Sequence, residues 1–153
     1  ASLQQPVRLI GVGVTEAGLA SPQTQAMKDL MELLRQLSRN RQQQQQNDDT
    51  KICIIDMDNV PNNGDIIHAH LMELAAAAGD DDDNMLQFIQ QRVVCLNTMV
   101  DRITSARAGS NGMVPKAEPL PAKALVVLDV DQNLPPHFDS APGVVVRSTR
   151  LQL

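Results

Sequence analysis

Aromatic residues are almost absent from this chain of 153 residues, which contains no Trp, no Tyr and only two Phe, Phe88 and Phe138. Its hydrophobic residues, 42% of the total, must therefore form a core from aliphatic side chains, Met and Ala. The chain also lacks a cluster of Lys and Arg, and its formal net charge is −5. Nucleic acids and anionic membrane surfaces are bound through concentrated positive charge. The composition therefore argues against both partners.

Long apolar runs are missing as well. No run approaches the roughly 18 to 20 residues that cross a bilayer, and the first residues lack the basic and then apolar pattern of a secretory signal. Cys53 and Cys95 lie inside apolar runs and form no CxxC pair, which favours free thiols over a disulfide or a metal site. Buried free thiols are typical of a reducing compartment. We therefore expect a soluble, cytoplasmic protein.

Several catalytic and metal-binding motifs are also absent. The chain has no G-x-S-x-G turn, no phosphate-binding loop and no H-E-x-x-H sequence. His68 and His70 are two residues apart on a predicted helix, so they cannot face one metal ion together. The acidic run Asp80 to Asp83 is more typical of a solvated connection than of a calcium loop. We expect no metal site.

Apolar segments that alternate with amphipathic ones indicate an α/β fold. A continuous apolar run, Ile52 to Ile55, is the pattern expected when helices cover both faces of a parallel sheet. The length predicts a single domain, residues 1–153, with a partial Rossmann-like parallel or mixed sheet and flanking helices. Strands are predicted at residues 7–14, 51–57, 92–96, 124–128 and 144–146, and helices after Pro22, at 65–78 and around 85–89.

Two segments without an apolar face are predicted to be flexible loops. Residues 41–50 contain an unbroken glutamine run followed by Asn and Asp, and residues 106–112 are rich in Gly, Ser and Asn.

Polar residues follow three successive predicted strands. They are Thr15 and Glu16, then Asp58 to Asn63, then Asn97 together with Asp101 and Arg102. If the strands are parallel neighbours, these clusters meet at one edge of the sheet, where α/β proteins bind ligands. The alternative is that Asn59 and Asn62 are turn and capping residues around Pro61, and that Asp101 and Arg102 form a structural ion pair.

Three motifs resemble the long-chain mannitol dehydrogenase family, which includes polyol dehydrogenases and fructuronate or related hexuronate reductases. They are Val14 to Gly18 (VTEAG), Asp58 to Gly64 (DNVPNNG) and Asn97 to Thr104 (NTMVDRIT). Their order and spacing fit the family, and the step Glu118-Pro119 resembles the family's lead into its second domain. The resemblance covers the later part of a cofactor domain and fades after about residue 120.

The resemblance implies metal-independent hydride transfer between NAD or NADP and a polyol or sugar acid. It implies that Asn59 is catalytic and polarises the reacting oxygen, and that Asp101, with Asn97 at the same strand end, binds the substrate. Thr15 and Glu16 would lie beside the cofactor, and Val100 would border the nicotinamide. The resemblance leaves open which of the two cofactors is used.

The chain also departs from the family pattern. Leu19 replaces an aromatic residue, and Cys95 with Leu96 replaces a Phe-Pro step, which changes the expected pocket. The family's glycine-rich dinucleotide turn and its catalytic lysine are missing, so we expect the isolated chain to need the remainder of an enzyme and to have little or no activity. Two alternatives remain: a non-catalytic interaction module on a half-Rossmann scaffold, and a different nucleotide-binding α/β protein.

Overall fold

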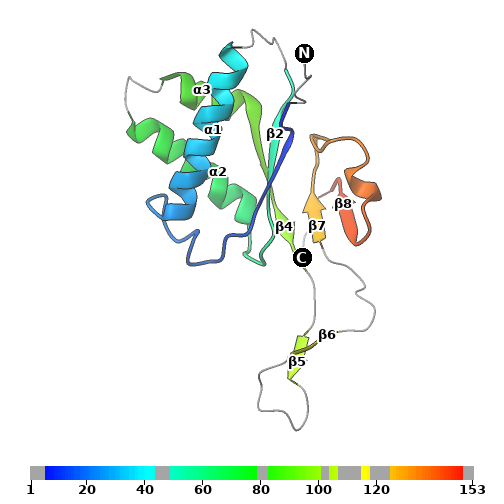
Figure 1. Cartoon of the computed structure of the whole chain (residues 1–153). Helices are drawn as coiled ribbons and strands as arrows, with labels where there is room; N and C mark the ends of the chain where they lie inside the picture. The colour runs from blue at the N-terminus through cyan, green and yellow to red at the C-terminus, as the bar shows by residue number, and fades with distance from the viewer. Residues whose placement is uncertain are drawn as a thin grey trace.

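A computed structural model describes residues 6–43, 49–78, 83–100, 104–106, 115–117 and 125–149 (Figure 1). None of the helices in these ranges is long and apolar enough to cross a membrane. Some sequence predictions concern residues outside the ranges, namely Asp80 to Asp82, Asp101 and Arg102, Glu118 and Pro119, and residues 44–48 and 107–112 of the two predicted loops.

Three parallel strands form the centre of the fold. β1 (Leu9–Val12), β2 (Ile52–Asp56) and β3 (Val93–Leu96) lie in the order β1-β2-β3, and both neighbouring pairs are parallel. β2 is buried at all five positions because it has a strand on each side and apolar layers above and below. The predicted α/β fold class is confirmed.

Three helices cover one face of this sheet (Figure 1). They are α1 (Gln25–Gln43), α2 (Asn63–Ala77) and α3 (Asp83–Arg92). The helices bury an apolar layer against the side chains of Ile54 and Val93 from the sheet. The buried helical residues are Met27, Leu30, Met31 and Leu34 of α1, Ile67, Leu71 and Ala75 of α2, and Met85 and Ile89 of α3.

Helix α1 is longer than the sequence predicts, because it continues through Gln43 into the predicted loop 41–50. Gln and Arg are good helix formers, so the glutamine-rich segment does not itself end the helix. The Arg41 guanidinium donates hydrogen bonds to the backbone oxygens of Thr50 at 2.8 Å and Val7 at 3.3 Å. These contacts tie the last turn of α1 to the segments that lead into β2 and β1.

The second face of the sheet is covered by strands and loops, which corrects the prediction of helices on both faces. Leu125 and Val127 pack against Cys53, Ile55 and Leu96, and the layer is extended by partly buried Leu134, Phe138 and Val144. Phe138 begins a single 3-10 turn, η2 (Phe138–Ser140). The apolar run 52–55 thus correctly predicts that both faces of the sheet are buried. It does not indicate whether helices or strands cover each face.

The strands after β3 make the fold mixed. β4 (Thr98–Met99) pairs antiparallel with β7 (Leu125–Leu128), which in turn pairs parallel with β8 (Val144–Arg147). Two further short strands, β5 (Thr104–Ala106) and β6 (Pro115–Ala117), pair with each other. The predicted strands at 124–128 and 144–146 are therefore present to within one residue at each end.

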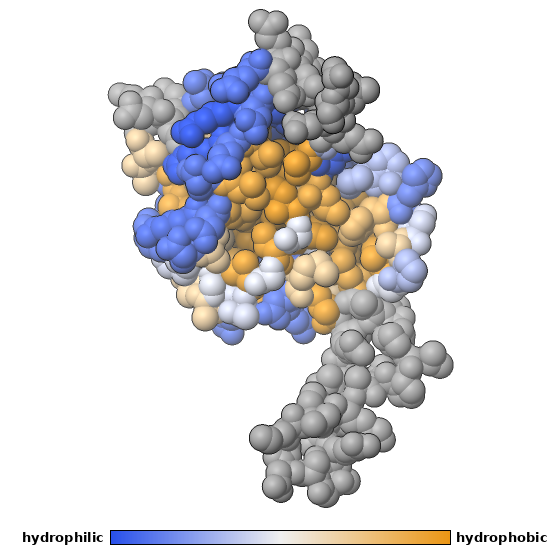
Figure 2. Space-filling view, in the orientation of Figure 1, coloured by the Kyte–Doolittle hydropathy of each residue, from blue (hydrophilic) through white to orange (hydrophobic). Residues whose placement is uncertain are grey.

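β1 lies at an edge of the sheet and pairs only with β2 within the described ranges. The backbone oxygens of Arg8 and Val12 accept hydrogen bonds from Cys53 and Met57, so the backbone groups of Leu9 and Gly11 point away from β2. Figure 2 shows apolar surface across the middle of this side of the molecule, next to the hydrophilic outer face of α1.

The start of α2 packs directly on the end of β3 through Gly64. A Cβ atom at Gly64 would lie 2.5 Å from the carbonyl carbon of Leu96 and 2.7 Å from the backbone nitrogen of Asn97. Backbone atoms in a paired strand cannot move aside as a flexible side chain can. Glycine is therefore required here for the close approach of helix and strand.

We expect Gly64→Ala to lower the free energy of unfolding by about 2 to 3 kcal/mol, because overpacking at a rigid contact strains the fold. Gly13→Ala is the matched control, since a Cβ at Gly13 meets no atom within 4 Å, and it should change stability by less than about 0.5 kcal/mol. Urea denaturation of both variants measures the difference. Equal effects of the two substitutions would contradict the close approach at Gly64.

Candidate functional site

The parallel order of β1, β2 and β3 brings their carboxyl ends to one edge of the sheet. Thr15 and Glu16 follow β1, Asp58 and Asn59 follow β2, and Asn97 follows β3. The register aligns Val12 with Asp56 and Ile55 with Leu96, so the three strands end at nearly the same level. Of the polar residues predicted from the sequence to follow these strands, Thr15, Glu16, Asp58, Asn59 and Asn97 therefore lie at the carboxyl ends of the three strands.

Asn63, at the first position of α2, holds two of these strand ends together. Its fully buried side chain donates from Nδ2 to Thr98 Oγ1 at 2.8 Å and to the backbone oxygen of Asp58 at 3.3 Å. Its Oδ1 accepts the backbone N–H of Thr98 at 2.9 Å and that of Gly64 at 2.8 Å. Both ends of the amide are used for structure, so Asn63 is not available to a ligand.

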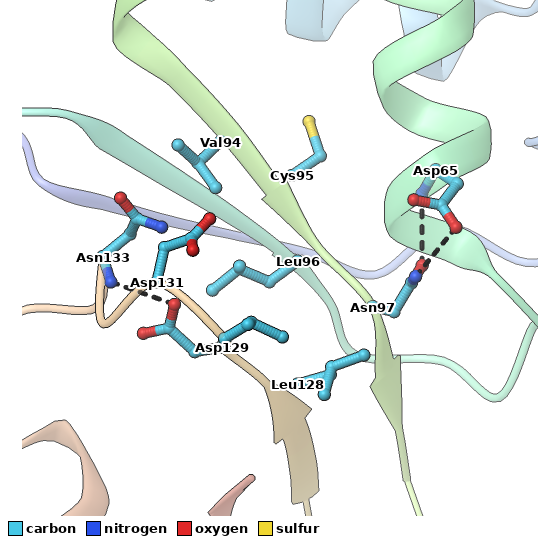
Figure 3. Close-up of a pocket in the computed structure, with 10 residues that line it drawn as sticks. Asp65, Val94, Cys95, Leu96, Asn97, Leu128, Asp129, Asp131 and Asn133 are labelled. Carbon is cyan, nitrogen blue, oxygen red and sulfur yellow. Dashed lines mark hydrogen bonds between the residues drawn. The ribbon is translucent and has the colours of Figure 1, made fainter. Parts of the chain in front are cut away.

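Asn97 is similarly engaged, by Asp65 in the first turn of α2 (Figure 3). Its Nδ2 donates to Asp65 Oδ2 at 2.9 Å, and its Oδ1 accepts the backbone N–H of Asp65 at 3.1 Å. Asn97 thus satisfies a free N–H at the helix start from another strand, as a capping residue does. Its predicted role in substrate binding stays a prediction and would require this pair to open.

Asn59 and Asn62 do not cap α2 with their side chains, which bears on the alternative that they are only turn and capping residues. Asn62 stands at the N-cap position with φ 54°, a left-handed conformation that Asn tolerates, and forms no side-chain cap hydrogen bond. Within the described residues the exposed Asn59 side chain forms no hydrogen bond; only its backbone N–H is used, by Asp58 Oδ1 at 2.8 Å. Among the described residues, none occupies the Asn59 amide.

The remaining predicted site residues lie in different environments. Thr15 and Glu16 are exposed in a turn after β1, in which the backbone oxygen of Thr15 accepts the N–H groups of Gly18 and Leu19. Val100 is half-buried and packs on the apolar layer of the second sheet face. Asp101 lies outside the described residues.

Asp56, a fully buried carboxyl group at the end of β2, is not among the residues predicted from the sequence. Its Oδ1 accepts the backbone N–H of Val14 at 3.1 Å and that of Asp58 at 3.3 Å, whereas Oδ2 has no hydrogen-bond partner within the described residues. Burial raises the pKa of Asp56 above its ordinary value of 3.8, and the backbone N–H groups partly oppose that rise. One feature of the sequence could have indicated Asp56: it is a carboxylate that directly follows the four apolar residues of a buried strand.

A hollow of about 180 Å³ lies between β3 and the turn that follows β7 (Figure 3). Asp65, Asn97, Asp129 and Asp131 contribute polar atoms to its lining. The Asp129 carboxylate is already engaged, because Oδ1 and Oδ2 accept the backbone N–H groups of Asn133 and Leu134, both at 2.9 Å. Within the described ranges no group of three or more His, Cys, Asp or Glu is arranged to hold a metal ion.

The two cysteines are free, as the sequence predicts, and lie on adjacent strands. The Cys53 thiol is buried and donates to the backbone oxygen of Asn133 at 3.0 Å, and Cys95 is half-buried. Burial raises the pKa of Cys53 to about 11 and that of Cys95 to about 12. Both thiols are therefore protonated at neutral pH.

We expect neither thiol to react rapidly with an aromatic disulfide reagent at about pH 8, because the reactive thiolate forms only near the raised pKa values. The same chain unfolded in urea should release two equivalents of the coloured thiol promptly. Absorbance against time measures both reactions. Rapid labelling of the folded chain would contradict the burial of these groups.

Asp56→Asn should become more stable relative to the wild type as the pH rises from about 4 to about 7. Folding raises the pKa of Asp56, so its contribution to stability is fully present below 3.8 and is lost as the pH rises through the folded-state pKa. The Asn variant keeps the acceptor Oδ1 and lacks this titration. Urea unfolding of both proteins across the pH range measures the difference in their free energies of unfolding. A difference that does not change with pH would contradict the raised pKa of Asp56.

The sequence profile of one protein family, described as the mannitol dehydrogenase Rossmann domain, matches residues 2–124. Among curated protein sequences no significant match is found.

Two solved structures are similar in fold to this chain. Mannitol 2-dehydrogenase of Pseudomonas fluorescens, in a ternary complex with NAD and D-mannitol, matches with a TM-score of 0.63 and 19% identity over 95% of this chain. A substrate-free D-sorbitol dehydrogenase matches with a TM-score of 0.57 and 19% identity over 93%. The chain spans 34% of the length of each dehydrogenase. Since the profile match covers more than half of its residues, the chain belongs to the mannitol dehydrogenase family.

Proposed function

We propose that this chain acts as part of an NAD(P)-dependent dehydrogenase that transfers hydride between the nicotinamide and a polyol or sugar acid. The observation that carries the proposal is the common sheet edge at which β1, β2 and β3 end with Thr15, Glu16, Asn59 and Asn97. Ligands of open α/β sheets bind outside the carboxyl ends of strands. The match to the mannitol dehydrogenase Rossmann domain supports a nicotinamide cofactor as the ligand.

The exposed residues at this edge fit a nicotinamide cofactor. Thr15 and Glu16 lie in the turn after β1, where the Thr15 hydroxyl can donate or accept a hydrogen bond and the Glu16 carboxylate can accept one from a ribose hydroxyl. Val100 would present an apolar surface to the nicotinamide ring. The cofactor would supply or accept the hydride, while the chain orients it and the substrate.

Asn59 is the best candidate for contact with the reacting oxygen. Its side chain is exposed and free of hydrogen bonds within the described residues, in contrast to those of Asn63 and Asn97. An amide N–H directed at that oxygen would stabilise the negative charge that develops on it when hydride and proton separate. Asp101 would bind a substrate hydroxyl.

The proton of the substrate hydroxyl needs an acceptor, a role that the family resemblance assigns to a lysine. Residues 13–19, 57–64 and 97–100 contain no Lys and no His. Hydride transfer by a dehydrogenase of this kind requires a general base. The proposed enzyme therefore combines this site with a base from another segment, and the chain by itself should have little or no activity.

In an active polypeptide that contains this chain, Asn59→Ala should lower kcat for polyol oxidation by about 10² to 10³-fold, as the loss of an oxyanion donor does. Asn62→Gly is the matched control, because Asn62 lies in the same turn, makes no side-chain cap hydrogen bond and has a backbone conformation that Gly adopts readily.

Steady-state kinetics with NAD and a polyol measures both variants, and the control should keep kcat within about twofold of the wild type. Unchanged turnover in Asn59→Ala would refute the role of Asn59. If the chain shows no affinity for either cofactor, the alternative of a non-catalytic interaction module is favoured.

A further inference from the structure

Asp56 lies where a charged group is costly, at the buried end of the central strand. Its side chain is fully buried, and Oδ2 has no hydrogen-bond partner within the described residues. An unpaired oxygen of a buried carboxyl group loses its hydration without compensation. Within the described residues, therefore, nothing offsets the cost of burying Oδ2, and the contribution of this carboxyl group comes through its other oxygen.

The oxygen that is paired joins two segments that are distant in sequence. Asp56 Oδ1 accepts the N–H of Val14 at 3.1 Å and the N–H of Asp58 at 3.3 Å. Val14 directly precedes Thr15 and Glu16, and Asp58 directly precedes Asn59. A single carboxylate oxygen thus fixes the backbone next to both groups of proposed ligand contacts.

The backbone of the same residue contacts the third strand end. The carbonyl oxygen of Asp56 accepts the hydroxyl of Thr98 at 2.5 Å. Thr98 is held from its other side by the Asn63 amide, and Val100 follows two residues later. Asp56 therefore contacts all three segments that end at the common sheet edge.

We propose that Asp56 is a positioning residue, which holds the Thr15–Glu16 turn and Asn59 at the separation that a nicotinamide cofactor requires. This inference rests on the proposed function. Asp56 does not touch the ligand itself; it acts through the backbone of Val14 and Asp58. Binding sites that contact one ligand from two loops depend on such tethers, because a shift of about 1 Å weakens the contacts.

Two substitutions distinguish the effect of the hydrogen bonds to Asp56 Oδ1 from the effects of the carboxylate charge and of side-chain size. Asp56→Asn keeps the acceptor Oδ1 and removes the charge, whereas Asp56→Leu has a similar size and removes the acceptor. We expect NADH to bind the Asn variant as it binds the wild type. We expect about tenfold weaker binding to the Leu variant, the effect of one or two lost hydrogen bonds. Asp56→Ala serves in place of Asp56→Leu if the latter does not fold.

The measurement is a titration of the ¹⁵N-labelled full chain with NADH, in which the amide signals of Thr15 and Glu16 report binding. Ile89→Val is the control for stability, since Ile89 lies on the buried face of α3, outside the segments that follow the three strands, and its truncation lowers stability. It should leave the dissociation constant for NADH unchanged. Wild-type affinity in both Asp56→Leu and Asp56→Ala would overturn the proposal, and so would an Asn variant as weak as the Leu variant.

Hydrogen exchange at the amides of Val14 and Asp58 separates this proposal from the proposed function. Exchange should be slow in the wild type and in Asp56→Asn and at least about tenfold faster in Asp56→Leu. If the wild type does not bind NADH but exchange follows this pattern, the proposed function fails and the tether stands. Equal exchange in all three proteins would overturn the tether, whatever the binding result.

Discussion

Pairing of β2 with a parallel strand on each side is the constraint on which the rest of the structure depends. It buries the apolar run 52–55 on both faces, and it forces the chain to cross from one end of the sheet to the other through α1 and then through α2 and α3. Because all three strands run in one direction, their ends carry their polar residues to the same edge. The polar residues of the site are thus brought together by the common direction of the three strands, and not by any single local motif.

The fold follows from sequence where a pattern repeats. The spacing of Met27, Leu30, Met31 and Leu34 predicts the buried stripe of α1, and the apolar run before Asp56 predicts a central strand. The cover of the second sheet face does not follow, because Leu125, Val127 and Phe138 reach it from far along the chain. The end of α1 at Gln43 also escapes prediction, since Gln is as compatible with a helix as with a solvated loop.

The site contains two amides that maintain the structure, Asn63 and Asn97, and two, Asn59 and Asn62, whose side chains form no hydrogen bond within the described residues. From sequence alone, Asn59, Asn62, Asn63 and Asn97 are equivalent polar residues near strand ends. In the structure Asn63 and Asn97 use both amide atoms within the protein, across 35 and 32 residues of sequence, whereas the Asn59 side chain remains exposed. Such long-range partners cannot be recognised from local spacing, and the hydrogen bond from Val14 to Asp56 across 42 residues is a further example.

The free edge of β1 has a consequence for the behaviour of the chain in solution. Natural sheets discourage pairing between molecules by placing Lys, Pro or a bulge on an edge strand. β1 reads Leu-Ile-Gly-Val, and its outward backbone groups belong to Leu9 and Gly11, so no charged residue or Pro within β1 itself opposes the approach of another strand. With the apolar surface that surrounds it in Figure 2, this edge is a template for strand addition. We therefore expect any association of the chain through β1 to increase with protein concentration.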